Sequence, residues 1–318
     1  MPILKYENLT YTELASLPRE KTCVFLCVSP LEQHGPHLPM GVDVFIAQFF
    51  SERILSKLSG KNPDWNFLVL PTFCSGTDVL EHTGSMSVKP ATLRAFLYDH
   101  CKQLARDGFR TIIAVSGHGG PRHLVVLEEL SEKMGWRHKT RMISASSHLI
   151  VEVLKGDFAD KIEAQMEKNG QKLSQEEKVS LKTDLHGGLF ETSLLLAFNK
   201  EHVRPIYKNL KPAVLSSMLK LRKNSGKKVG DGLGYLGTPS LARAEIGEAA
   251  IAVISEMMLP LLERFLNGEK VSKYFHSKFY YIPFFRTDFK LFLILALYII
   301  LFGLAWWFVQ NMMIRLVS

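Results

Sequence analysis

The sequence feature that most constrains the fold is a short apolar run, residues 22–28, followed directly by a polar segment, residues 29–43. The run is rich in β-forming residues and is ended by a proline, which predicts a buried strand. The polar segment would then lie at the carboxyl end of this strand, where open α/β sheets usually bind ligands. Within fifteen residues the segment holds four side chains that could bind a metal, namely Glu32, His34, His37 and Asp43.

The spacing inside this segment indicates a metal site. If residues 32–34 are extended, the side chains of Glu32 and His34 point the same way. A carboxylate and an imidazole that converge are ligands for a borderline divalent metal such as Zn²⁺, Mn²⁺ or Fe²⁺. The glycines and prolines of the segment would let it turn back and bring Asp43 to the same point. For any one of these residues alone a polar turn is the simpler interpretation, but the whole cluster favours a metal.

The rest of the chain alternates between strand-like and helical patterns, which predicts a mainly parallel sheet with helices on its faces. Further strands are expected at residues 65–71, 109–116 and 141–145, and helices at 90–106 and 248–265. Residues 158–183 are charged and polar. We interpret them as a solvated, mobile insertion with a helical stretch around residues 161–168.

The C-terminal part contains a different kind of segment. Residues 291–309 carry no charge, and as a helix they would span roughly 28 Å, close to the hydrocarbon thickness of a bilayer. A buried core helix is the alternative, but the segment has no polar face. Basic residues are more frequent before this segment than after it, which predicts a single-pass C-terminal membrane anchor with the N-terminal part in the cytoplasm. The expected organisation is a domain at 1–267, a basic, aromatic juxtamembrane linker at 268–288, a transmembrane helix at 289–311 and a short tail at 312–318.

Charge and cysteine content exclude other classes of protein. The net charge of +8 comes largely from two basic clusters, at residues 220–228 and 270–290. No aromatic-interleaved basic stripe accompanies them, so no role with nucleic acid is expected. The four cysteines show no disulfide spacing, which fits a reducing compartment. The N-terminus does not resemble a signal peptide and leads into a capping-box helix start at residues 10–13.

Three further clusters of polar residues lie where strands are expected to meet loops, at residues 75–82, 115–123 and 184–193. In the second cluster glycines flank a histidine and would let the backbone pass close to an ion or substrate. The candidates that these clusters supply are Ser75, Glu81, His82, His118, Gly119, Gly120, Asp184, His186 and Glu191. A single histidine is more often structural than functional. Six of the eleven histidines fall within the four clusters, which packing alone does not explain.

Together these clusters resemble the creatininase (creatinine amidohydrolase) family. The resemblance rests on residues 31–43, 116–120, 184–193 and 237–247 and extends roughly from residue 8 to residue 265. It implies a three-layer α/β/α sandwich, a metal-dependent amidohydrolase and a homo-oligomer, commonly a hexamer. The family also includes formamide deformylases of flavin and deazaflavin biosynthesis and a peptidase that trims a redox-peptide precursor.

The resemblance also implies roles for individual residues. Glu32, His34, Asp43 and His118 match metal ligands, with Asp43 as the bridge between two divalent ions. Glu191 matches a residue that serves as ligand or substrate contact, and His186 matches a histidine that acts beside the metal. The expected chemistry is attack of a metal-bound hydroxide on an amide carbonyl, with His186 or Glu191 protonating the departing nitrogen. The residues expected to contact the substrate are Ser75, Glu81, His82, Gly119, Gly120 and Asp184.

The sequence also departs from the family pattern. Creatinine-hydrolysing members carry an acidic ligand where this chain has Gly120, which argues against creatinine as the substrate. The second metal is then held by Glu191 or bound weakly, so one or two ions are expected. We expect cleavage of a non-peptide C–N bond in a cyclic amide or formamide. The alternatives are a small-peptide peptidase, a catalytically inactive membrane-tethered scaffold and a metal sensor without turnover. A catalytically inactive site would be expected to have lost some of its six ligand and acid–base residues, and all six are present.

Overall fold

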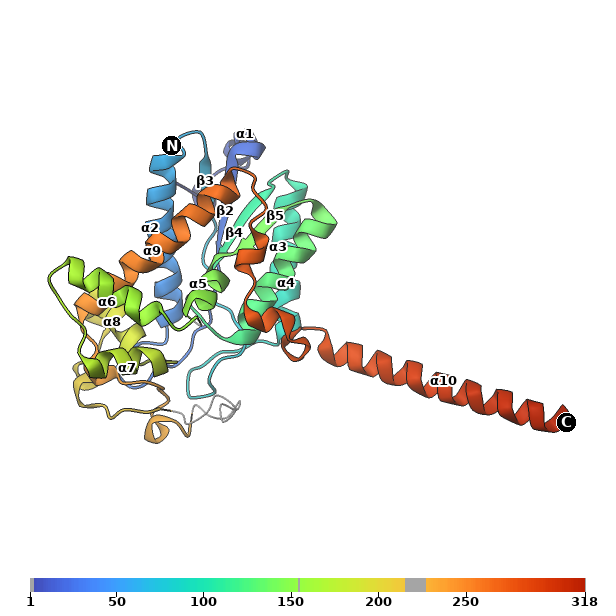
Figure 1. Cartoon of the computed structure of the whole chain (residues 1–318). Coiled ribbons are helices and arrows are strands. Elements are labelled where there is room, and N and C mark those ends of the chain that lie inside the picture. Colours follow the sequence, from blue (N-terminus) through green and yellow to red (C-terminus); the bar gives the residue numbers. More distant parts are fainter. Residues whose placement is uncertain (1–2, 154, 215–226, 318) are drawn as a thin grey trace.

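A computed structural model of the chain describes residues 3–153, 155–214 and 227–317, and it contains one sheet of five parallel strands (Figure 1). Their spatial order is β1-β3-β2-β4-β5. The bounds are β1 Ile3–Lys5, β2 Thr22–Cys27, β3 Asn66–Val69, β4 Thr111–Val115 and β5 Arg141–Ser144. The four strands expected from the sequence are all present, and the sequence analysis did not find β1.

Helices cover both faces of this sheet because the central strands β2 and β4 are apolar on both sides. In β2, Cys23 and Phe25 belong to one core cluster, and Val24 and Leu26 belong to the other. The helices that pack in the first cluster include α2 (Val42–Lys61), α8 (Leu189–Phe198) and α9 (Ala244–Leu266). The helices of the second are α3 (Pro90–Arg106) and α4 (Pro121–His138). The expected three-layer α/β/α sandwich is therefore confirmed.

The connections between strands form a topological switch point at the carboxyl edge of the sheet. From β2 the chain passes through α2 to β3 on one side, and from β3 through α3 to β4 on the other side of β2. The connections that follow β2 and β4 therefore diverge to opposite faces. Such a switch point is where doubly wound sheets bind ligands. The polar segments after β2 and after β4 both lie there.

The segment that was expected to be a solvated insertion is folded into the core. It forms α6 (Phe158–Lys168) and α7 (Gln175–Thr183), and the side chains of Ile162 and Met166 in α6 are fully buried among the residues of the first core cluster. The expected helical stretch around residues 161–168 is present in α6. The interpretation of this stretch as solvated was wrong, because an amphipathic helix needs only one apolar stripe and the charged residues cover its other face.

The remaining elements are shorter. Helix α1 (Tyr11–Ser16) begins with the expected capping box between Thr10 and Glu13, and α5 (Ala145–Val153) follows β5 directly. The described 3₁₀ helices are Tyr6–Asn8, Arg19–Lys21, Lys200–His202, Pro205–Asn209, Gly230–Gly232, Pro239–Leu241, Ser272–Phe275, Lys278–Tyr281 and Pro283–Phe285. Positions 215–226, which include most of the first basic cluster, lie outside the described residues.

Helix α10 (Phe289–Val317) projects away from the rest of the molecule (Figure 1). Its stretch Leu291–Met313 has 23 residues and would span about 35 Å. Within the described part of the chain it is the only helix long and apolar enough to cross a membrane, and none of this stretch is buried. Its length and composition agree with the expected anchor.

Candidate metal centre

The segment after β2 folds back on itself and brings its polar residues together. The backbone N–H of Glu32 donates to the carbonyl oxygen of Met40 at 2.9 Å, which closes the loop. Asp43 then lies in the first turn of α2. The loop after β4 adds His118. The side chains of all four candidate ligands (Glu32, His34, Asp43 and His118) are buried.

Asp43 lies between two imidazoles. Its Oδ1 atom is 3.3 Å from His34 Nε2, and its Oδ2 atom is 3.2 Å from His118 Nδ1. Glu32 Oε2 is 3.0 Å from the same His118 nitrogen. Two donor atoms that bind the same ion, each at about 2.1 Å from it, lie roughly 3.0–3.4 Å apart from each other. The observed separations therefore suit donors that share a metal.

Each histidine is oriented by its other ring nitrogen. His34 Nδ1 donates to the carbonyl oxygen of Glu32 at 3.0 Å, and His118 Nε2 donates to the carbonyl oxygen of Thr77 at 3.2 Å. A carbonyl can only accept, so the nitrogen that faces it carries the proton. In the neutral rings the lone pairs then lie on His34 Nε2 and His118 Nδ1, the two atoms that face Asp43. Metal-binding histidines are held in the same way.

The polar atoms at the centre of the cluster are unsatisfied. Among the residues that the structure describes, four buried atoms here have no hydrogen-bond partner: Glu32 Oε2, His34 Nε2, Asp43 Oδ1 and Asp43 Oδ2. An unpaired buried polar group costs about 1–3 kcal/mol, and charged groups cost more. One or two divalent cations would satisfy these four atoms, so the residues present fit a metal.

The electrostatics of the cluster point the same way. Burial opposes protonation of His34, but the carboxylates of Glu191 and Asp43 raise its pKa to about 10. Burial likewise opposes protonation of His118, and Glu32 and Asp43 raise its pKa well above the ordinary value. The carboxylates thus create a site that strongly favours positive charge, which protons supply in the metal-free protein. A metal would displace these protons.

Two residues of the cluster at 184–193 complete the centre. Glu191, in the first turn of α8, places Oε2 at 3.7 Å from His34 Nε2 and accepts a hydrogen bond from the Gly187 N–H at 2.5 Å. The ring of His186 stacks on His34 with 4.1 Å between centroids. Burial and the neighbouring His34 lower the pKa of His186, which favours its neutral form. The Glu191 side chain is 18% exposed, against 1% for Glu32 and Asp43, so Glu191 is the carboxylate most accessible to a substrate.

These six residues form three overlapping sets of possible ligands. The sets are Glu32–His34–His186, Glu32–Asp43–His118 and His34–Asp43–Glu191. The last two share only Asp43, whose two oxygens face different histidines. This arrangement suits a carboxylate that bridges two ions.

The other candidate side chains are not part of this cluster of six residues. Asp184 Oδ2 accepts a hydrogen bond from the Phe190 N–H at 2.5 Å, and burial raises the Asp184 pKa to about 8. His82 Nε2 donates to the carbonyl oxygen of Gly232 at 3.2 Å and so joins two loops. None of the three ligand sets found in the described residues includes Asp184, His82, Ser75 or Glu81.

The two glycines after His118 differ in their surroundings. Gly119 is exposed, whereas Gly120 caps α4. A Cβ atom on Gly120 would lie 2.3 Å from His118 Nε2 and 3.0 Å from the carbonyl oxygen of Asp78. This backbone therefore leaves no room for an acidic ligand at position 120.

Some groups that shape the centre were not found from the sequence. The carbonyl oxygen of Thr77 orients His118, and the N–H of Leu80 donates to Glu32 Oε1 at 2.5 Å. The carbonyl oxygen of Gln33 accepts from His186 Nε2 at 2.5 Å. Since these are backbone groups, any residue type can supply them and no sequence pattern marks them. His37, the fourth potential metal ligand of the first segment, belongs to none of the three ligand sets found among the described residues. Its Nε2 is hydrogen-bonded to Thr192 Oγ1 at 3.0 Å.

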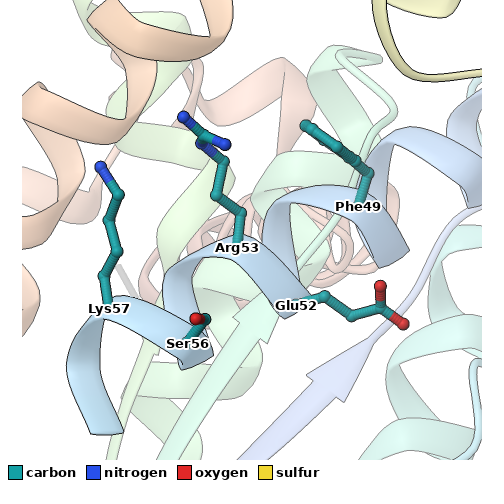
Figure 2. A pocket seen from close by; sticks show the side chains of 5 residues that line it. All are labelled: Phe49, Glu52, Arg53, Ser56 and Lys57. Atoms are coloured by element: carbon teal, nitrogen blue, oxygen red, sulfur yellow. The ribbon is translucent and has the colours of Figure 1, made fainter. Parts of the chain in front are cut away.

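A surface cavity of about 320 Å³ lies elsewhere in the fold (Figure 2). Its lining comes from one side of α2: Phe49, Glu52, Arg53, Ser56 and Lys57. The Arg53 Nε atom donates to Ser255 Oγ of α9 at 3.1 Å. The cavity contains none of the six residues of the cluster, so the metal centre remains the candidate functional site.

Comparisons with known proteins agree with this geometry. Residues 7–262 match the family model described as creatininase, creatinine amidohydrolase. The mycofactocin precursor peptide peptidase of Mycobacterium ulcerans (strain Agy99) is 25% identical over 264 residues, covering 80% of this chain and 90% of that protein. The creatinine amidohydrolase of Pseudomonas putida is 27% identical over 198 residues, covering 60% of this chain and 70% of that protein.

Solved structures show the same fold. A crystal structure of creatinine amidohydrolase aligns with a TM-score of 0.60 at 21% identity, covering 83% of this chain and 98% of the other. A creatininase structure described as the Mn form aligns with a TM-score of 0.59 at 21% identity, covering 83% and 99%. The family match covers most of the chain and includes every residue of the metal centre. The chain therefore belongs to the creatininase family, whose members are metal-dependent amidohydrolases.

Proposed function

We propose that this protein is a metal-dependent amidohydrolase that cleaves a non-peptide C–N bond in a cyclic amide or formamide. Glu32, His34, Asp43 and His118 would hold one or two divalent ions, with Glu191 as a further ligand. Zinc, manganese and iron all suit this mixture of nitrogen and oxygen donors. The observation that carries the proposal is the convergence of four buried donor atoms without hydrogen-bond partners among the described residues.

The bound metal would supply a water molecule of lowered pKa and polarise the substrate carbonyl. The protein's own residues would handle the protons. Glu191 is the most exposed carboxylate of the cluster, and it could take up the proton that the attacking water releases and pass it to the departing nitrogen. His186 is fixed by the carbonyl oxygen of Gln33 and by stacking on His34, and its neutral ring could assist the same transfer.

Gly120 bears on the choice of substrate. The acidic ligand that accompanies creatinine hydrolysis is absent, and the backbone has no room for one. This favours an amide other than creatinine. A small-peptide peptidase is the second candidate, because the relative that matches over 264 residues is a peptidase of a peptide precursor.

Hydrolysis assays on the metal-loaded full-length protein test both candidates. The panel should contain N-formylated amines, five- and six-membered cyclic amides, creatinine and short peptides. We expect turnover of a formamide or cyclic amide that Glu191→Gln abolishes, while the ion held by Glu32, Asp43 and His118 remains bound. Turnover of peptides alone would establish the peptidase. Tight metal binding without turnover of any amide would contradict both and favour the sensor.

We also propose that α10 anchors the protein in a membrane, with the hydrolase domain on the cytoplasmic side, and that the protein forms a homo-oligomer. The anchoring rests on the exposed apolar stretch Leu291–Met313, and the orientation rests on the basic residues that precede it. Flotation of the full-length protein with liposomes tests the anchor, and recovery of all protein in the soluble fraction would refute it. Protease protection in intact cells tests the orientation, and mass measurement in detergent tests the oligomer.

A further inference from the structure

The segment between the hydrolase domain and α10 is packed against the domain along much of its length. This juxtamembrane segment, residues 268–288, contains three 3₁₀ helices. Val271, Phe275 and Ser277 in it are almost fully buried. The carbonyl oxygen of Tyr274 accepts a hydrogen bond from His148 Nδ1 of α5 at 3.0 Å. A flexible spacer would not bury these side chains.

Two acidic residues of α4 hold the segment in place. Glu128, which is fully buried, accepts hydrogen bonds from the backbone N–H of Ser277 at 2.8 Å and from its hydroxyl at 3.2 Å. Glu129 Oε1 accepts from Arg286 Nε at 2.7 Å and from the N–H of Thr287 at 3.1 Å. The bond between the Arg286 guanidinium and Glu129 is charge-assisted, and such bonds are about twice as strong as neutral ones. We call these contacts of Glu128 and Glu129 the acidic clamp.

The clamp extends to the residue directly before α10. Arg94 of α3 donates to Glu129 Oε2 at 2.9 Å and to Asp288 Oδ1 at 2.6 Å. The Arg122 guanidinium of α4 lies 4.8 Å from the centre of the Phe284 ring. The start of the apolar helix is therefore fixed to both α3 and α4.

The surface around this attachment suits the interface of a membrane. Tyr281, Ile282 and Phe284 are 67%, 43% and 56% exposed and lie just before the apolar helix. Aromatic side chains at this position typically reside among lipid headgroups. Two exposed lysines accompany them, Lys89 directly before α3 and Lys278 in the juxtamembrane segment. Such cations attract anionic headgroups by about 1 kcal/mol each.

From these contacts we propose that the juxtamembrane segment is a rigid mount, which holds the face formed by α3, α4 and residues 277–288 against an anionic bilayer. The inference rests on the proposed anchoring. On a free tether of 21 residues the domain would move over distances of roughly 25 Å and present every face to the membrane. The acidic clamp prevents this motion, so one face stays on the bilayer and the hydrolase works at a fixed orientation.

Fluorophores at two positions of the full-length protein test the mount. Ala91, one turn from Arg94 in α3, lies on the proposed face. Tyr11 is 85% exposed and lies in α1, at the amino-terminal edge of the sheet (Figure 1). Ala91→Cys and Tyr11→Cys would be labelled in a Cys74→Ser background, since the other three cysteines are buried. The proteins are reconstituted in phosphatidylcholine–phosphatidylserine vesicles that carry a nitroxide headgroup lipid.

We expect strong quenching of the label at position 91 and none at position 11. The variant Arg286→Gln with Asp288→Asn removes the side-chain contacts of residues 286 and 288 with Glu129 and Arg94, and keeps the hydrogen bonds of Ser277 to Glu128. It should reduce the difference between the two labels, because residues 278–288 are then held less tightly. Equal quenching at both positions in the parent protein would refute the rigid mount. So would the absence of quenching at position 91 in a protein that floats with the vesicles. Failure to float would refute the anchoring and leave the hydrolase proposal untouched.

Discussion

Replacing Asp43 by asparagine tests the proposed bridging carboxylate directly. The substitution keeps the size of the side chain and one oxygen, but removes the negative charge and turns the second oxygen into an NH₂ donor. Asp43 Oδ1 and Oδ2 face His34 Nε2 at 3.3 Å and His118 Nδ1 at 3.2 Å. At most one of these two histidines can therefore still share an ion with an oxygen of residue 43.

The size of the effect follows from the role of the lost atom. Removal of a group that only orients a metal ligand typically lowers affinity 10–100-fold. Loss of a direct ligand should cost at least the upper value, about 2.7 kcal/mol for one of the ions. Proton release gives a second measure. Because the carboxylates raise the pKa of His34 to about 10 against the effect of burial, and raise that of His118, the parent should release about two protons on binding metal near pH 7.

Elemental analysis and calorimetric titration with zinc or manganese measure both quantities. The parent protein should hold two ions per chain and Asp43→Asn at most one, with fewer protons released. Glu52→Gln is a matched control, since Glu52 is an exposed acid on the same helix. An asparagine variant with unchanged stoichiometry, affinity and proton release would refute a bridging role for Asp43. A parent that holds one ion would instead indicate a mononuclear centre.

Three further predictions concern the surroundings of the centre. Gly120→Ala should lower metal affinity roughly 10–100-fold in the same titration, because the added Cβ would displace His118 from the Thr77 carbonyl oxygen. Tighter metal binding by this variant would contradict the prediction. Gly120→Glu should not gain creatinine hydrolysis. Asp184 has a folded-state pKa raised by burial to about 8, against about 3.9 when unfolded, so its stabilising contribution is complete below pH 4 and is lost as the pH rises to 8. Asp184→Asn should remove this pH dependence from chemical denaturation curves, and an unchanged profile would argue against it. A protein that ends at residue 267 should be less stable to unfolding than one that ends at residue 288, by about 4 kcal/mol. Truncation removes Val271 and Phe275 from the surface that they cover, and it leaves the buried Glu128 without its partner Ser277. Equal denaturation midpoints of the two proteins would contradict this prediction.

The metal centre shows which features of a site can be predicted from the local sequence. The strand at residues 22–28 and the ligands beside it could be found because an apolar run, its terminating proline and the polar residues that follow are neighbours in the chain. The sequence also marked His118, His186 and Glu191 as candidates through their positions at the ends of strands and helices. It could not give the pairing of Asp43 with two imidazoles, since that depends on how the loops after β2 and β4 meet the start of α2.

The juxtamembrane segment shows the opposite case. Its basic and aromatic composition predicted a linker between a domain and an apolar helix, and the apolar helix itself was evident from nineteen uncharged residues. No sequence pattern indicated that Ser277 would satisfy the buried Glu128, 149 positions away. The same is true of α6, where a charged segment proved to bury Ile162 and Met166.

Sequence alone determined the features that depend on local periodicity and on residue chemistry: the alternating strands and helices, the inventory of metal-binding side chains and the apolar C-terminal helix. Tertiary structure decided the features that depend on distant partners. These are the tautomer of His118, the approach of the Asp78 carbonyl oxygen to Gly120 and the attachment of residues 268–288 to α4. The physical reason is that hydrogen bonds and close contacts between distant segments form only when the whole chain has folded, and backbone groups that make them are the same in every residue type.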